Sequence, residues 1–181
     1  IAISFVGIII SILLWPFLLK SPINNFIDTM ENMTQFAIAI RQVFEGEMQW
    51  SDMLPWYYTP KFVLMTIPLA VIAGLIFHLI LMWSNKKNIF WSSLILFTFV
   101  FPIFWIIYQK SNVYGGWRHA MFSYPTMVVF AGLGFDYAIN MIKDKRAKIA
   151  LTILPFALLI MPMCHIIKNH PYQYVYFNEL A

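Results

Sequence analysis

The sequence predicts an all-α fold, a polytopic bundle of about five transmembrane helices with an amphipathic helix on its outer surface. Two features of the composition support this prediction: 61% of the 181 residues are apolar and only 11% are charged. The mean hydropathy of +0.71 agrees with them. Soluble domains are about 25% charged and about half apolar, and disordered chains carry far less apolar surface. We therefore expect lipid to be the main solvent of this protein.

Five apolar segments are long enough to cross a bilayer, which requires about 20 helical residues. They are residues 1–19, 62–83, 89–108, 120–141 and 149–167. We expect helices because lipid cannot hydrogen-bond a free backbone and because the segments lack strand alternation. Gly132 and Gly134 should let spans approach closely, and His78 is expected to pack against or bond a neighbouring helix. The chain 1–181 is thus predicted to be a single transmembrane region.

The chain begins with Ile1 inside an apolar run, without an initiator methionine or the charged region of a signal peptide. We therefore expect it to be a fragment of a longer polytopic protein. On this interpretation, the tail 168–181 begins a further segment on the outer side of the membrane.

The basic residues predict the orientation in the membrane. The short connections 84–88 and 143–148 contain six of the twelve Lys and Arg residues, which predicts that both are cytoplasmic. Residues 20–61, 109–119 and the tail then lie on the opposite side, together with many Tyr and Trp residues, as expected for an interfacial belt. This places the working face on the non-cytoplasmic side.

Residues 22–46 are predicted to form the amphipathic helix of the outer side. Pro22 suits the first helical position, apolar residues then recur at spacings of mostly three and four, and Gly46 can end the helix. Such a helix either lies flat on the outer membrane surface or caps the bundle. The alternative is an ordinary loop helix packed on protein.

Several classes of function lack support. The net charge of +4 is spread too thinly for a nucleic-acid surface, so no nucleic-acid partner is expected. The single cysteine, Cys164, excludes an internal disulfide and a cysteine-built metal site. His165 and His170 make a poor metal pair, and no phosphate-binding glycine loop or nucleophile elbow is found. No cofactor is implied, although the sequence leaves the use of a divalent metal open.

The segment that enters the fourth predicted span has the strongest functional pattern. Gly115 and Gly116 allow a tight turn, and Trp117 can lie at the level of the lipid headgroups. Arg118 and His119 follow where the helix enters the lipid. A guanidinium can bind phosphate bidentately, and the start of a helix adds positive potential. The segment therefore predicts a site for an anionic lipid headgroup, unless Arg118 only anchors the helix by snorkelling.

A second cluster precedes the second predicted span. Trp56, Tyr57 and Tyr58 lie close to Lys61, and aromatic rings beside a cation could bind a sugar and its phosphate. The same residues are equally typical of an aromatic belt.

The third cluster is the tail. Tyr172, Tyr174 and Tyr176 alternate, which favours an extended chain that forms a lid or begins an outer domain. A catalytic carboxylate is not evident, because none of the acidic residues of the outer loop is embedded among apolar residues. The sequence therefore leaves the catalytic residues unknown.

These three motifs, in this order, resemble the bacterial membrane glycosyltransferases of the family 39 type, relatives of the protein O-mannosyltransferases and the lipid A aminoarabinose transferases. The motifs are Trp-Tyr-Tyr with Pro and Lys (56–68), Arg-His followed by Tyr-Pro (118–125), and His-Pro-Tyr followed by Tyr-Phe-Asn-Glu-Leu (170–180). The resemblance covers the chain from about Met53 onward. It implies a GT-C fold in a bacterial plasma membrane and an enzyme that transfers sugar from a polyprenyl phosphate to an acceptor on the non-cytoplasmic side.

The resemblance also implies roles for individual residues. Lys61 and Arg118 are expected near the lipid phosphate, with His119 bonding the phosphate or orienting Arg118. Contacts with the sugar or headgroup are expected from Trp56, Tyr57, Tyr58, Trp117, Tyr176 and Asn178. The catalytic acid of that family lies in an early outer loop, which here would precede Ile1. This part of the chain is therefore not expected to catalyse transfer alone.

Two other classes of function are left open. A transporter or flippase-like bundle could use the proline and glycine breaks as a path for a lipid-linked or small anionic substrate. Transporters usually place ionisable groups near the membrane midplane, whereas the spans here are nearly uncharged and the polar residues gather on one side. This distribution favours interfacial chemistry. A purely structural membrane subunit is the third class.

Overall fold

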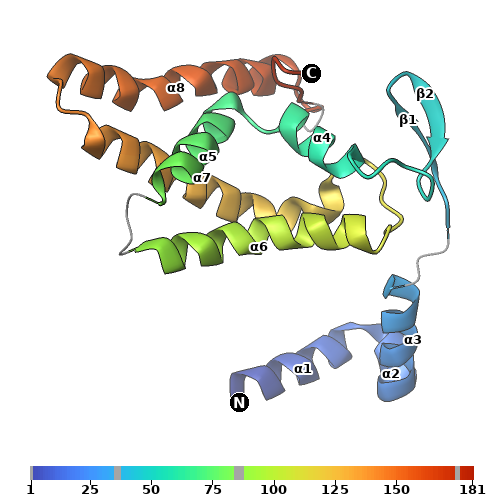
Figure 1. Ribbon diagram of the computed structural model, residues 1–181. Helices are drawn as coiled ribbons and strands as arrows, with labels where there is room; N and C mark the ends of the chain where they lie inside the picture. The colour runs from blue at the N-terminus through green and yellow to red at the C-terminus, as the bar shows by residue number, and fades with distance from the viewer. Residues whose placement is uncertain (1, 35–37, 84–87, 174–175) are drawn as a thin grey trace. The chain divides into compact units, whose positions relative to one another are not determined.

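The computed structural model describes residues 2–34, 38–83, 88–173 and 176–181 (Figure 1). The chain divides into two compact units, residues 1–39 and 40–181. Each unit is described here by itself.

The first unit contains three helices: α1 (Ala2–Leu14), α2 (Pro16–Lys20) and α3 (Pro22–Thr34). α1 stops before Pro16, which begins α2 because proline lacks a backbone N–H and fits the first turn of a helix. The predicted span 1–19 is therefore not one continuous helix, which corrects that prediction. The three helices line an open, mainly apolar cavity of about 650 Å³.

The predicted helix 22–46 is wrong beyond Thr34. The chain instead forms a β-hairpin of β1 (Arg41–Phe44) and β2 (Glu47–Trp50), so the fold is not purely α-helical. Glu45 and Gly46 both have positive φ values, 54° and 83°, which suit a two-residue hairpin turn. Phe44 is buried while its neighbour Val43 is exposed, as expected when successive side chains of a strand point to opposite faces. Residues 35–37 of the predicted helix lie outside the described residues.

The second unit is mainly helical. Its helices are α4 (Tyr58–Thr66), α5 (Leu69–Leu81), α6 (Ile89–Tyr108), a 3₁₀ helix (Arg118–Ser123), α7 (Tyr124–Met141) and α8 (Lys145–Lys168). Of the described helices, α6 and α8 are long and apolar enough to cross a membrane. A third span exists if α4 and α5, which are bent by 112°, count as one.

The structure therefore supports two to three of the five predicted spans. α6 and α8 match the predicted segments 89–108 and 149–167, and the bent pair occupies 62–83. The segment 120–141 begins as a 3₁₀ helix, and α7 carries Asp136 and Asn140, so this segment is less apolar than α6. Within the predicted loop 84–88, which contributes to the orientation, residues 84–87 lie outside the described residues.

α5 and α7 pack closely through two glycines. A Cβ atom added at Gly134 would lie 2.0 Å from the carbonyl oxygen of Gly74, so the helices could not approach this closely with larger residues. His78 is fully buried beside this contact. Its Nδ1 lies 2.9 Å from the carbonyl oxygen of Phe130 in α7, and its Nε2 lies 2.9 Å from Ser92 Oγ in α6. The predicted bond of His78 to a neighbouring helix is confirmed, and it links three helices.

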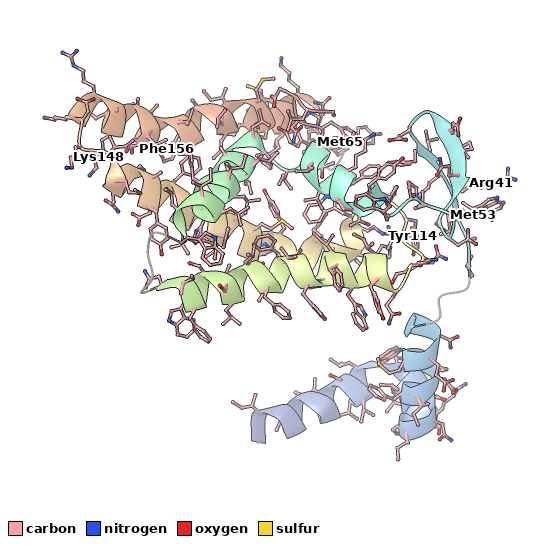
Figure 2. The ribbon with its side chains drawn as sticks, viewed as in Figure 1. Arg41, Met53, Met65, Tyr114, Lys148 and Phe156 are labelled. Carbon is pink, nitrogen blue, oxygen red and sulfur yellow. The ribbon has the colours of Figure 1, made fainter. Side chains whose placement is uncertain are left out.

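The helices of the second unit alternate in direction, so its connections gather at two ends. α6 and α8 both begin at the end where Lys148 lies, whereas the hairpin, α4, Tyr114 and the tail lie at the other end (Figures 1 and 2). The basic segment 143–148 is thus separated from the three motifs of interest, which share one end of the unit.

Candidate functional site

Tyr58 fixes the turn that precedes Arg118. Its hydroxyl donates to Gln42 Oε1 of the hairpin at 2.8 Å and accepts from the backbone N–H of Gly116 at 3.0 Å. Gly115 and Gly116 have φ values of 66° and 71°, which glycine adopts without strain. Tyr58 is only 2% exposed. Tyr58 therefore positions the turn through these two hydrogen bonds. The sequence predicted instead that it contacts a sugar or headgroup.

Arg118 follows this turn and is exposed. Its guanidinium carbon lies 4.5 Å from the ring centroid of Tyr114. Among the residues that the structure describes, no carboxylate forms an ion pair with Arg118. The ring of His119 meets the edge of Tyr114 at a centroid distance of 4.8 Å. Burial and the charge of Arg118 lower the pKa of His119, so its imidazole is neutral near pH 7. Within the described part of the chain, the charge of Arg118 is thus faced by the ring of Tyr114 and by no carboxylate.

A cavity of about 530 Å³ opens beside Arg118. It lies between the bend of α4 and α5, the turn 115–116, the C-terminal half of α8 and the tail. Trp117 lines it, with its indole N–H donating to Thr66 Oγ1 at 2.7 Å. The structure therefore brings together three predicted site residues, Trp117, Arg118 and Tyr176. Thr66, Pro68, Tyr124 and Pro162 also line the cavity.

Tyr176, which lines this cavity, and His165, which packs against Tyr176, each have one buried polar atom without a hydrogen-bond partner. These atoms are the hydroxyl of Tyr176 and Nε2 of His165. The two rings meet edge to face at a centroid distance of 5.3 Å. Burial is the main cause that raises the pKa of Tyr176, with Glu179 and Tyr124 adding to it, so its hydroxyl stays protonated. The sequence did not place His165 here, because only the tertiary fold brings α8 to the tail.

Lys61 is not among the residues that line this cavity, and its expected place near a lipid phosphate stays a prediction. Its ammonium forms an ion pair with Glu45 Oε1 at 2.5 Å and lies 5.5 Å from the ring centroid of Phe44. Tyr57 donates its hydroxyl to Glu45 Oε2 at 3.2 Å. The bond from Lys61 lowers the pKa of Glu45, which keeps the carboxylate ionised. Lys61 and Tyr57 thus hold the hairpin to α4.

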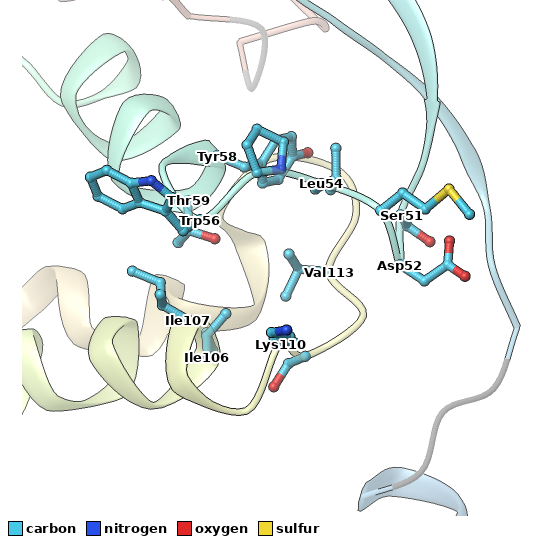
Figure 3. Close-up of a pocket in the computed structure, with 13 residues that line it drawn as sticks. Ser51, Asp52, Leu54, Trp56, Tyr58, Thr59, Ile106, Ile107, Lys110 and Val113 are labelled. Carbon is cyan, nitrogen blue, oxygen red and sulfur yellow. The ribbon is translucent and has the colours of Figure 1, made fainter.

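Trp56 and Tyr58 line a different cavity of about 330 Å³ (Figure 3). Asp52, Thr59 and Lys110 also line it, which gives it charges of both signs. Trp56 is 71% exposed. Trp56 and Tyr58 therefore line one cavity, and Trp117 and Tyr176 line another at the same end of the unit.

Asn178 is buried, and its amide is fully used inside the chain. Its Nδ2 donates to the carbonyl oxygens of Leu64 and Ile67 at 2.6 and 2.7 Å, and its Oδ1 accepts from the backbone N–H of Leu180. The predicted contact of Asn178 with a headgroup therefore has no free amide atom in this structure.

No group of three or more His, Cys, Asp or Glu residues that could hold a metal ion occurs in the described part of the chain. Comparison with known protein families, curated proteins and solved structures gives no match.

Proposed function

We propose that this chain is the membrane part of a glycosyltransferase that takes sugar from a polyprenyl-phosphate donor. Arg118 would bind the phosphate of this donor at the cavity of about 530 Å³. The observation that supports this best is a guanidinium, paired with no carboxylate of the described residues, on an apolar cavity beside α8, a helix apolar enough to cross a membrane. A phosphate on an apolar chain needs these two surroundings together.

The chemistry follows from this placement. In the transfer, the bond between the anomeric carbon and the phosphate oxygen breaks, and a bond from the anomeric carbon to the acceptor oxygen forms. Negative charge grows on the departing phosphate, so a guanidinium beside it stabilises the transition state more than the ground state. The acceptor proton leaves with a base that this chain does not identify. The apolar walls around Pro68 and Pro162 would hold the first prenyl units of the donor.

The location on the non-cytoplasmic side is part of the same proposal. It is supported by the separation of the segment 143–148, rich in Lys and Arg, from the end that carries Arg118.

Arg118→Ala in the whole protein tests this function. Binding of a polyprenyl phosphate to the protein in nanodiscs should weaken about tenfold or more, since a charge-assisted hydrogen bond contributes about 1.5–3 kcal/mol. Sugar transfer should fall with it. Lys61→Met is the matched control, because it removes a cation that Glu45 already neutralises. Unchanged binding by Arg118→Ala, or an equal loss in both variants, would contradict the role of Arg118.

A transporter or flippase-like bundle is the second candidate, because the break between α4 and α5 resembles the discontinuous helices of transporters. In transporters the freed carbonyls at such a break coordinate the coupling ion, whereas here the amide of Asn178 donates to those of Leu64 and Ile67. Movement of labelled polyprenyl-phosphate sugar across proteoliposomes without an acceptor would favour transport over transfer.

A further inference from the structure

The unpartnered atoms of Tyr176 and His165 are the least expected feature of the second unit. A buried polar group without a hydrogen bond destabilises the folded chain, typically by about 1–3 kcal/mol. Most buried polar groups in proteins therefore have partners. Here two such atoms lie on adjoining rings: that of Tyr176 in the tail, which lines the cavity beside Arg118, and that of His165 in α8, which packs against Tyr176. A single ligand that forms a hydrogen bond with each of them would satisfy both atoms.

Both groups are able to donate a hydrogen bond. The side-chain amide of Asn169 donates to Nδ1 of His165 at 3.1 Å, which leaves the proton of a neutral imidazole on Nε2. The hydroxyl of Tyr176 is protonated because burial raises its pKa. No carboxylate is among the described residues that line the cavity. Glu179 is exposed and affects Tyr176 only through its charge. A ligand that satisfies both atoms should therefore be a hydrogen-bond acceptor.

We propose that Tyr176 and His165 donate hydrogen bonds to the same phosphate that Arg118 binds, so that three segments of the chain form one phosphate site. This inference rests on the proposed function and specifies its ligand contacts. A phosphate has enough acceptor oxygens for a guanidinium, a hydroxyl and an imidazole N–H, and bonds to an ionised acceptor are the stronger kind. The two polar groups would find their partners only when the ligand is bound.

Tyr176→Phe tests this inference because it removes a single oxygen atom. In a structural role, loss of an unpartnered hydroxyl leaves the ligand-free protein as stable as before or more stable. In a binding role, affinity for polyprenyl phosphate falls about tenfold, while affinity for the uncharged polyprenol stays the same. Both ligands are measured in nanodiscs with the whole protein, beside thermal unfolding without ligand. Tyr172→Phe, on the same tail and 63% exposed, is the control.

His165→Phe provides a second variant that keeps a ring against Tyr176 but removes the donor. The exposed His170→Phe is its control. We expect His165→Phe to weaken phosphate binding about as much as Tyr176→Phe. Inorganic phosphate, added as a competitor of polyprenyl phosphate, shows whether the phosphate alone is recognised. Weaker competition by inorganic phosphate in Tyr176→Phe than in the wild type would support the shared phosphate site.

The outcomes separate the two proposals. If Arg118→Ala weakens binding and both Tyr176→Phe and His165→Phe leave it unchanged, the three-donor site is wrong and the proposed function stands. An equal loss of polyprenol and polyprenyl phosphate binding in Tyr176→Phe would also overturn the site, because the residue would then contact the chain. If the wild-type protein binds no polyprenyl phosphate, the proposed function fails.

Discussion

At the scale of single residues, Asn178 closes the break between two helices. Pro68 cannot donate a hydrogen bond, so the carbonyls of the last turn of α4 lose helical partners. Two bonds from the amide of Asn178, and one from its backbone N–H to Met65, satisfy them. The tail is thereby fixed near the cavity, which is how Tyr176 reaches its place.

Asn178→Asp should therefore destabilise the fold. It replaces an NH₂ donor with a carboxylate oxygen that faces two carbonyl oxygens, and it leaves buried acceptors unpaired. We expect the free energy of unfolding to fall by about 2 kcal/mol or more, measured by denaturation in detergent. Asn24→Asp, on the exposed surface of α3, is the control and should change stability little. Equal stability of both variants would show that the amide does not hold the break.

At the scale of elements, the sequence was most informative where one physical effect dominated. The uncharged, mainly apolar segment 89–108 forms α6 with the predicted bounds, because a helix satisfies the backbone of such a segment internally. The hairpin was missed because apolar spacings of three and four in residues 22–46 masked the short alternation after Ile40. The segment 62–83 was predicted as one span, but the chain bends by 112° near Pro68, since a proline can either kink a helix or end it.

Some residues of the candidate site could be predicted from the sequence, and others could not. The motif around Gly115, Gly116 and Arg118 could be found because its chemistry is local. The pairing of Lys61 with Glu45 and the approach of His165 to Tyr176 depend on the tertiary fold. A single sequence does not reveal which distant residues will neutralise or adjoin each other.

The contact between α5 and α7 gives a sharp prediction, because α7 carries two glycines with different surroundings. A Cβ at Gly134 would lie 2.0 Å from the carbonyl oxygen of Gly74, whereas a Cβ at Gly132 has no neighbour within 4 Å. Gly134→Ala should lower the free energy of unfolding by about 1–3 kcal/mol or more through overpacking. Gly132→Ala should be neutral or slightly stabilising, because alanine favours a helix. Thermal unfolding of the two variants in detergent tests this, and similar shifts in both would contradict the close contact.

At the scale of the whole molecule, the separation of charges between the two ends of the second unit predicts the orientation in the membrane. The first turn of α8 carries cations that should stay on the cytoplasmic side, and the hairpin should face outward. Single cysteines at two exposed positions report on this after Cys164 is replaced by alanine: Met48→Cys in β2 and Ala147→Cys in α8. Neither substitution changes a charge. We expect a membrane-impermeant maleimide to label Met48→Cys in intact cells, and Ala147→Cys only after the membrane is opened. Labelling of both in detergent is the control for accessibility. The reverse pattern would place Arg118 on the cytoplasmic side, and a donor phosphate would then have to be bound from that side.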